Sequence, residues 1–291
     1  AEANSVAFLP DVAKTLSNLG VLYSDTQRHQ EAEQAYEEAL QIRRKLAETN
    51  PGAYLPDVAI TLNNLGILYR AMQRQEEAGR AYEEALQIQR KLAEANPAAY
   101  LPYVATALNN LGNLYSAMQR HEEAGRAYEE ALQIQRKLAG ANPAAYLPDV
   151  ARMLNNLGVL YGDTQRHKKA EQAYEEALQI RRKLAEANPA AYLPDVAQTL
   201  NNLGNLYADT QRLEKAGRAY EEALQIYRKL AGTNPAAHLS ELITTLQNMK
   251  TLMEQKGKTQ QAVQLDREMN LASAEFDAIK KRPSSSASGW R

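Results

Sequence analysis

The chain has no cysteine, which excludes disulfides and thiolate metal sites and fits a reducing compartment. It also lacks an excess of either charge, because 34 basic residues stand against 35 acidic ones. The chain therefore has no basic excess with which to neutralise a phosphate backbone, so no nucleic acid is expected as the main partner. No apolar run approaches the roughly 18 residues of a membrane span, and the first residues do not resemble a secretory signal. We expect a cytoplasmic protein that does not enter a membrane.

Proline and glycine, by contrast, recur with a fixed period of 46 residues. The recurring positions are Pro10, Pro56, Pro102, Pro148 and Pro194; Gly20, Gly66, Gly112, Gly158 and Gly204; and Pro51, Pro97, Pro143, Pro189 and Pro235. A period of this size indicates one supersecondary unit stacked on copies of itself, each covering the apolar face of its neighbour. The sequence therefore predicts an elongated scaffold rather than a closed globule with one pocket.

One copy of the repeat shows helical spacing of apolar residues in two segments, 56–72 and about 76–94. The polar stretch 73–75 separates them. Asn96-Pro97 ends the second helix, since proline disfavours the helical region for the residue before it. Residues 98–101 are then expected to form a loop that leads to Pro102, where the next helix begins. No segment alternates with period two, so no sheet is expected.

The framework residues of each copy carry a specific pattern. In the second copy it reads Leu65-Gly66 with Tyr69, followed by Ala78, Tyr82 and Ala85, and it recurs in the other copies. This pattern resembles the tetratricopeptide repeat, in the long-repeat form of kinesin light chain and its bacterial relatives. The resemblance implies an all-α, right-handed superhelical solenoid of helix–turn–helix units. Two departures are the 46-residue unit, longer than the usual ~34 residues, and the missing tryptophan.

The resemblance places five full repeats and a degenerate sixth in the array 1–282. Their limits are near 10–55, 56–101, 102–147, 148–193, 194–239 and 240–282. In the sixth copy Lys250 replaces the glycine and Asp266 replaces the tyrosine, as expected of a capping repeat with a water-facing side. Residues 283–291 read as a Ser/Gly-rich tail. Trp290 and Arg291 at its end either occupy a groove of this or another copy, or form a free end.

Asparagine marks the first helix of every copy. The positions are Asn18, Asn64, Asn110, Asn156, Asn202 and Asn248, with a second asparagine before four of them, at Asn63, Asn109, Asn155 and Asn201. The resemblance implies that the first helices line a concave surface where ligands bind. A ladder of amides there would hold the backbone of an extended peptide. The alternative is that the asparagines bond to neighbouring helices and serve the stack alone.

The positions beside this ladder vary between copies, which suits local selectivity for the side chains of a ligand. They include Lys14, Arg70, Arg152, Asn113 and Asn205. Drift at exposed positions is the alternative, and an outer series is expected to drift in the same way. That series is Arg43, Gln89, Gln135, Arg181 and Tyr227.

No catalytic constellation, cofactor motif or metal site is evident in the sequence. His29, His121 and His167 share one turn position, each without a second ligand nearby, and are expected to be solvated. The leading hypothesis is a non-catalytic scaffold that binds an extended peptide or a partner protein in its concave groove. The alternatives are a structural or regulatory arm of a larger multidomain bacterial protein, whose effector domain lies outside this segment, and self-assembly through the ends of the array.

Overall fold

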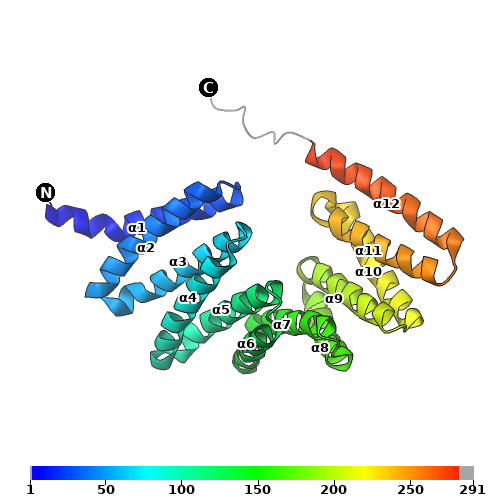
Figure 1. The fold of residues 1–291 in the computed structure, drawn as a ribbon, viewed down its shortest axis with the longest axis horizontal. Coiled ribbons are helices and arrows are strands. Elements are labelled where there is room, and N and C mark those ends of the chain that lie inside the picture. Colours follow the sequence, from blue (N-terminus) through cyan, green and yellow to red (C-terminus); the bar gives the residue numbers. More distant parts are fainter. Residues whose placement is uncertain (1, 282–291) are drawn as a thin grey trace. The chain divides into compact units, whose positions relative to one another are not determined.

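The computed structural model describes the backbone of residues 2–281 and the side chains of residues 8–281. Over this range the chain forms twelve helices and no strand, which confirms the all-α fold (Figure 1). It divides into two compact units, residues 1–156 and 157–291, which are described separately below. The helices are α1 (Glu2–Asp25), α2 (His29–Thr49), α3 (Pro51–Ala71), α4 (Gln75–Ala95), α5 (Pro97–Ala117), α6 (His121–Ala141), α7 (Pro143–Asp163), α8 (His167–Ala187), α9 (Pro189–Asp209), α10 (Leu213–Thr233), α11 (Pro235–Gln255) and α12 (Thr259–Lys280).

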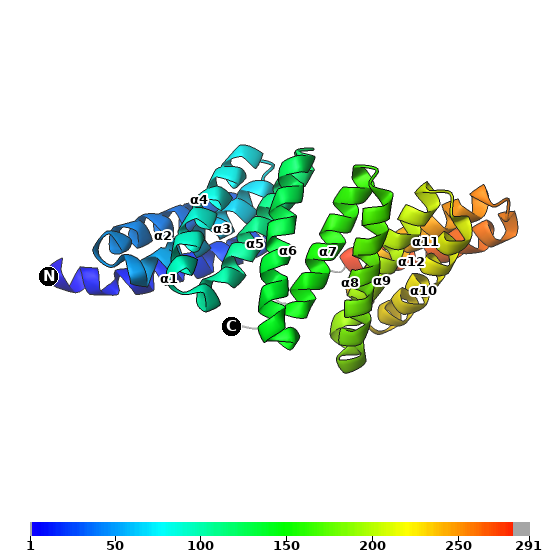
Figure 2. The ribbon, with the colours of Figure 1, turned by 90° about the horizontal axis from the view of Figure 1, so that it is seen from below.

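Within each unit, every helix packs on the next, as the neighbouring ribbons of Figure 2 show. The first helices of successive repeats also contact one another: α1 meets α3, α3 meets α5, and α9 meets α11. Over the residues described, the backbones of successive second helices do not approach each other in this way within either unit. Because the first helices approach each other more closely, they lie on the inner side of the curved stack in each unit.

From the second repeat on, the first helix of each repeat begins five residues earlier than predicted from the sequence. Asn50 caps α3, its side-chain oxygen accepting a bond from the Ala53 amide at 3.3 Å, and Pro51 is the first helical residue. Pro56 therefore lies inside α3, and residues 98–101 belong to α5. The predicted loop was wrong because an asparagine cap followed by proline starts a helix strongly. A proline so near the start removes only one backbone donor.

The turn within each repeat depends on a residue with positive φ. Gln27, Gln73, Gln119, Gln165 and Gln211 have φ between 57° and 62°, and Gly257 takes the same place in the sixth copy with φ 69°. The left-handed conformation lets the chain reverse while the next amides cap the finished helix. In the second repeat, for example, the Arg74 amide donates to the Tyr69 carbonyl at 2.8 Å.

The core of each repeat rests on a tyrosine ring packed against a helix backbone. A Cβ atom at Gly112 would lie 2.5 Å from Cε1 of Tyr128, so a side chain there has no room. The same contact joins Gly66 to Tyr82 and recurs in the other full repeats. The glycine and tyrosine recur 16 residues apart because each needs the other. In the sixth copy both are replaced, and Lys250 instead bonds Asp266 at 2.5 Å. This pair lowers the pKa of the Asp266 carboxyl and raises that of Lys250.

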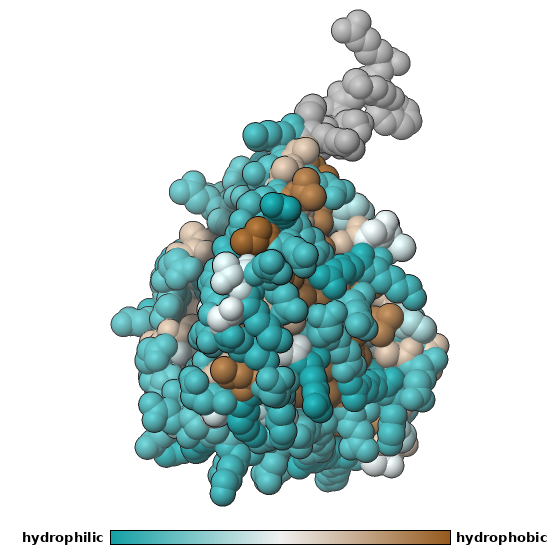
Figure 3. All heavy atoms as spheres, turned by 90° about the vertical axis from the view of Figure 1, so that its right-hand side faces the viewer, coloured by the Kyte–Doolittle hydropathy of each residue, from teal (hydrophilic) through white to brown (hydrophobic). Residues whose placement is uncertain are grey.

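The last helix has the polar exterior expected of a cap. The side of the molecule where α12 lies is largely hydrophilic, with hydrophobic residues in small separate patches (Figure 3). Leu271 is one such residue, 74% exposed.

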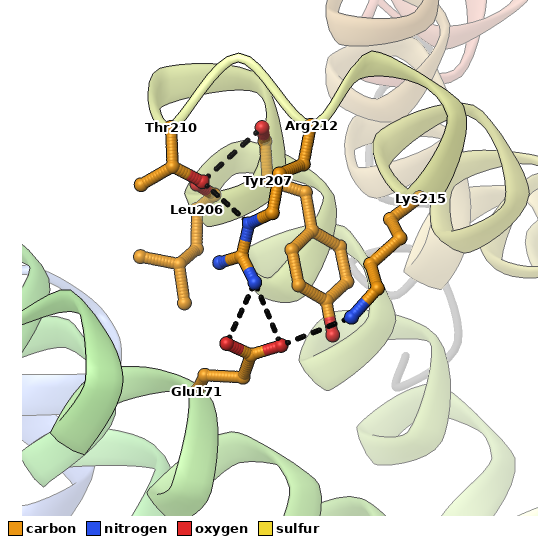
Figure 4. Close-up of polar contacts among 6 residues, drawn as sticks. All are labelled: Glu171, Leu206, Tyr207, Thr210, Arg212 and Lys215. Carbon is orange, nitrogen blue, oxygen red and sulfur yellow. Dashed lines mark hydrogen bonds and ion pairs between the residues drawn. The ribbon is translucent and has the colours of Figure 1, made fainter.

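Charged side chains join consecutive second helices on the outer side. Arg44 bonds Glu84 at 2.6 Å, and Arg90, Arg182 and Arg228 make the equivalent pairs with Glu130, Glu222 and Glu268. A second link is seen in Figure 4, where the Arg212 guanidinium donates hydrogen bonds to both carboxylate oxygens of Glu171, at 2.7 and 2.9 Å. The Arg212 guanidinium also lies 4.6 Å from the centre of the Tyr207 ring. The exposed pairs among these, such as Arg44 with Glu84, each stabilise by about 1 kcal/mol or less.

The outer series predicted to drift in solvent is in fact buried. Arg43, Gln89, Gln135, Arg181 and Tyr227 are only 2–7% exposed and lie at the joints between repeats. Arg181 donates to the Asp195 carbonyl at 2.9 Å and to the Thr199 hydroxyl, and Arg43 does the same with Asp57 and Thr61. Burial lowers the pKa of Arg43. The prediction failed because helical spacing marks a face but does not show that the next repeat covers it.

The buried residues at the joints vary in matched pairs. Arginine occurs with threonine 18 positions later, in Arg43–Thr61 and Arg181–Thr199. The two glutamines have other residues 18 positions later: Ala107 follows Gln89, and Met153 follows Gln135. A guanidinium buried among apolar groups needs acceptors, and the threonine hydroxyl supplies one.

We therefore predict strong coupling between Arg43 and Thr61. Thr61→Ala alone should lower the free energy of unfolding by about 1–3 kcal/mol, because the guanidinium loses a buried acceptor. The same change in an Arg43→Gln background should cost less than about 0.5 kcal/mol, since Gln89 with Ala107 already forms such a joint. Urea unfolding of the four proteins measures this cycle. Additive effects would show that the pairing is incidental.

Candidate peptide-binding surface

The inner surface of the first unit is formed by α1, α3, α5 and the first part of α7, and that of the second unit by α9 and α11. Here the predicted asparagine ladder is bonded to itself. Asn110 donates its side-chain N–H to the Asn63 oxygen at 2.8 Å, and Asn156 donates to Asn109 at 2.9 Å. In the second unit Asn248 donates to Asn201 at 3.1 Å. Each of these bonds thus joins the asparagine equivalent to Asn64 in one repeat to the asparagine equivalent to Asn63 in the repeat before it.

This relay uses only part of what each amide offers. An asparagine side chain has two N–H donors and an oxygen with two lone pairs, and each of these bonds uses one donor and one lone pair. The relay fixes the orientation of the six amides that these bonds join, because each of them is held from the neighbouring helix. Burial separates the asparagines of the ladder into three groups. Asn109 and Asn155 are buried and Asn18 is exposed, while the others are half-buried, namely Asn63, Asn64, Asn110, Asn156, Asn201, Asn202 and Asn248.

Two further predicted site residues contact the framework tyrosines. The Asn113 side-chain oxygen accepts a bond from the Tyr128 hydroxyl at 2.7 Å, and Asn205 makes the same bond with Tyr220. In the second repeat Ile67 occupies this position, and the buried Tyr82 hydroxyl has no partner among the described residues. Burial raises the pKa of Tyr82 to about 12. The variation at these positions therefore changes the bonding of the core as well as the surface.

The cations predicted beside the ladder differ in how available they are. Lys14 and Arg70 are exposed, whereas Arg152 is half-buried and bonds Asp149 at 2.6 Å. Ile67 is 43% exposed next to Asn64. The inner surface of the first unit thus offers oriented amides beside an apolar side chain and free positive charge.

Within the described part of the chain, the resolved pKa shifts follow burial and ion pairing. Each resolved shift of a carboxyl pKa is downward, as for Glu171 beside Arg212. The pKa of Tyr207 rises to about 12, chiefly through burial, which keeps its hydroxyl protonated. No group of three or more potential metal-ligating side chains occurs between residues 8 and 281. His29, His121 and His167 are half-buried first residues of helices, not the solvated turn residues that were predicted.

Two hollows of the structure have no counterpart in the sequence pattern. A cavity of about 630 Å³ lies between α10, α11 and α12, lined by Met249, Met253 and Leu265 beneath charged side chains. A smaller one, of about 280 Å³, lies where α3, α4 and α5 meet. No asparagine of the ladder lines either cavity. No repeated motif marks these hollows, because they arise where neighbouring copies differ. Trp290 and Arg291, for which the sequence leaves open a place in a groove or a free end, lie outside the described residues.

Comparisons with known proteins agree with this architecture. Residues 11–91, 103–183 and 195–268 match the family model of the tetratricopeptide repeat. No curated protein is similar enough in sequence to count as a relative. Among the described residues, no helix combines the length and apolar character required to cross a membrane.

Solved structures of similar fold share little sequence with this chain. BtubC (BKLC) from P. vanneervenii is 23% identical with a TM-score of 0.69, and the match covers 88% of this chain and 95% of that one. RapI in its apo form is 16% identical with a TM-score of 0.61, over 91% and 99% of the two chains. A putative kinesin light chain of Podosopora anserina, with nearly identical TPR-like repeats, is 18% identical with a TM-score of 0.60, over 77% and 98%. At these identities the likeness concerns the fold.

We predict that Ile67→Asn stabilises the protein. The new amide oxygen should accept a hydrogen bond from the Tyr82 hydroxyl, as the Asn113 oxygen does from Tyr128. Because this pairs a buried group, the free energy of unfolding should rise by about 1 kcal/mol. Thermal unfolding of the variant measures this. The matched control, Asn113→Ile, should cost a similar amount. A loss of stability for Ile67→Asn would contradict the role assigned to these asparagines.

Proposed function

This chain belongs to the tetratricopeptide repeat family, and on that premise we propose that the inner surface of its first helices binds an extended peptide of a partner protein. Repeats of this family generally mediate protein–protein interaction. The chain acts in this proposal as a non-catalytic scaffold, and the asparagine ladder is its principal contact.

The observation that supports the proposal is the relay itself. Asn110 and Asn156 each use one N–H to hold the preceding repeat, and each is half-buried rather than enclosed. Their remaining donor and lone pairs are the groups available to a ligand. Because the relay already fixes these side chains, a peptide would not have to order them, which lowers the entropic cost of binding. A peptide backbone carries one donor and one acceptor per residue, so it matches such a row irrespective of its sequence.

Selectivity would come from the neighbours of the ladder. Ile67 lies three residues and Arg70 six residues after Asn64, within two helical turns, and both are exposed. The equivalent positions carry different residues in other repeats, such as Asn113 with Ser116 and Asn205 with Ala208. A ligand side chain therefore meets an apolar and cationic site at the second repeat and a polar one at the third.

We predict that Asn110→Ala with Asn156→Ala weakens peptide binding by about 10- to 100-fold, the equivalent of two hydrogen bonds of about 0.5–1.5 kcal/mol each. Peptides would be selected from an unbiased library by their binding to the whole natural chain. Their affinities for the natural chain and for the double variant would then be measured by fluorescence anisotropy. Helicity and thermal unfolding of the variant are recorded in parallel, because the same changes remove bonds between repeats.

A matched variant separates binding from structure. Asn63→Asp retains an acceptor for the Asn110 N–H but removes the two donors of residue 63. It should leave the relay in place and weaken any peptide that accepts a bond from Asn63. If no peptide binds the chain, or if the hits ignore all these changes, the ladder serves the stack alone. That result would favour the second candidate, a structural or regulatory arm of a larger protein.

A further inference from the structure

Helix α1 leaves exposed a face that the later first helices bury. Leu22 is 55% exposed and Val12 is 42% exposed. Their equivalents in other repeats of both units are at most 4% exposed, namely Leu68, Leu114, Leu206 and Leu252, and Val58, Val104 and Val196. Helix α1 packs on α2 as closely as α3 packs on α4. The difference in exposure therefore marks the surface that a preceding second helix covers.

Specific polar contacts accompany this cover at two joints, which we call the arginine joints. At the first, Arg43 of α2 donates to the Asp57 carbonyl and the Thr61 hydroxyl of α3. Glu33 of α2 accepts two bonds from Arg74, at 2.7 and 2.8 Å. The second arginine joint lies between α8 and α9, where the equivalent pairs are Arg181 with Asp195 and Thr199, and Glu171 with Arg212.

The sequence distinguishes the arginine joints from the others on both of their sides. Helices α2 and α8 carry the same stretch, residues 33–48 and 171–186, whereas α4, α6 and α10 have glycine for its glutamate and glutamine or tyrosine for its first arginine. The helices that follow α2 and α8 share Pro-Asp-Val-Ala-x-Thr-Leu, at residues 56–62 and 194–200. Residues 10–16 of α1 repeat that sequence, whereas α5, α7 and α11 depart from it. Helix α1 therefore has the receiving sequence of an arginine joint.

The groups that would receive the arginine already have the arrangement seen at an occupied joint. The Thr15 hydroxyl donates to the Asp11 carbonyl at 2.9 Å, as the Thr61 hydroxyl donates to the Asp57 carbonyl at 2.8 Å. This bond uses the hydroxyl proton and leaves the oxygen lone pairs as acceptors. At Thr61 those lone pairs meet the guanidinium of Arg43. Thr15 and Asp11 are exposed, so an arriving helix can reach them.

The turn after α1 supplies the cation that would receive the glutamate. Arg28 bonds Glu31 through Nε and Nη2, and Arg74 bonds Glu77 through the same two atoms. In Arg74 the third nitrogen, Nη1, holds Glu33 of the preceding repeat. A glutamate on an arriving helix would thus find the corresponding nitrogen of Arg28 in a position to pair with it.

We propose that this face of α1 docks an amphipathic helix of another protein chain, one that carries a glutamate ten residues before an arginine, as Glu33 and Arg43 stand in α2. Burial of Leu22 and Val12 would drive the association, and the two polar contacts would select the partner. The proposal uses no residue of the asparagine ladder, so it stands or fails independently of the proposed peptide binding.

A second copy of this chain is a poorer partner. Helices α2 and α8 have the required sequence, but α3 and α9 already cover them. In α12, the second helix of the last repeat, Val263 occupies the position of Glu33 and Ser273 that of Arg43. The described end of the array therefore lacks both selecting groups.

The test uses a fluorescein-labelled peptide with the sequence of α8, residues 167–187. A hydrocarbon link between the positions of Lys168 and Gln172, both exposed in the array, holds the peptide helical, since an isolated helix of this length is marginal in water. Fluorescence anisotropy with the whole natural chain should show binding. Arg181→Gln in the peptide should weaken it about tenfold, as the loss of a hydrogen bond to a charged group does. No binding by a peptide whose helicity is verified by circular dichroism, or equal affinities of the two peptides, would overturn the proposal.

A change in the chain identifies the acceptor. Thr15→Ala should weaken the arginine peptide about tenfold and the glutamine peptide less than twofold, because the effects of two groups in contact are not additive. Equal losses for both peptides would show that the arginine does not meet Thr15, and would contradict the proposed docking geometry.

A second variant locates the docked helix. Leu22→Asp should abolish binding without loss of helicity or cooperative unfolding, because Leu22 is exposed. Its matched control is Leu271→Asp on α12, which is 74% exposed and should bind the peptide as the natural chain does. Binding that persists in Leu22→Asp would overturn the proposal. Sedimentation velocity of the chain alone tests the other occupant, since a dimer that Leu22→Asp dissociates would assign the face to a second copy and contradict the proposed partner.

Discussion

Every joint between repeats buries polar side chains, and the structure depends on pairing them. A helix carries too few apolar residues to cover both of its neighbours with hydrocarbon alone, so amides, hydroxyls and guanidinium groups enter the interface. Each must then find a partner, since an unpaired buried group costs as much as several good contacts provide. The solutions here are specific: Arg181 with Thr199, Asn110 with Asn63, and Tyr128 with Asn113. They lie between or within repeats at fixed offsets, so that the stack keeps its register.

The same requirement shows where the copies differ in function. Where a pair is complete, the joint is closed and serves stability. Where a substitution removes one partner, as at Gln89 and Tyr82, a buried group is left with unused bonding capacity. The asparagine relay lies between these two cases, because an amide such as Asn110 is held by one bond and retains other bonding capacity. In the proposed function, the residues for stability and for recognition are therefore not separate sets on the inner surface. The amides that join the repeats are also the groups that a peptide would meet.

Much of the fold follows from the sequence alone. The pattern that includes Gly66 and Tyr82 predicts the helix–turn–helix unit, and the 46-residue spacing predicts the stack. The start of the first helix was not predicted correctly, because Pro56 was taken as a helix start when the cap at Asn50 acts first. The buried series at Arg43 was missed for a different reason. Burial between repeats depends on the packing of helices from neighbouring copies, which the spacing within one helix does not contain. The paired change of Arg43 with Thr61 was the signal that could have revealed it.

The central claim is that the ladder amides are held by one bond and open at the others. The side-chain amide of Asn110 tests it most directly, because NMR resolves its two protons. The account predicts that the proton bonded to Asn63 exchanges slowly with solvent, while the other exchanges quickly and shifts when a bound peptide is added. Equal and slow exchange of both protons, unchanged by any selected peptide, would contradict the account and leave the ladder as a purely structural device.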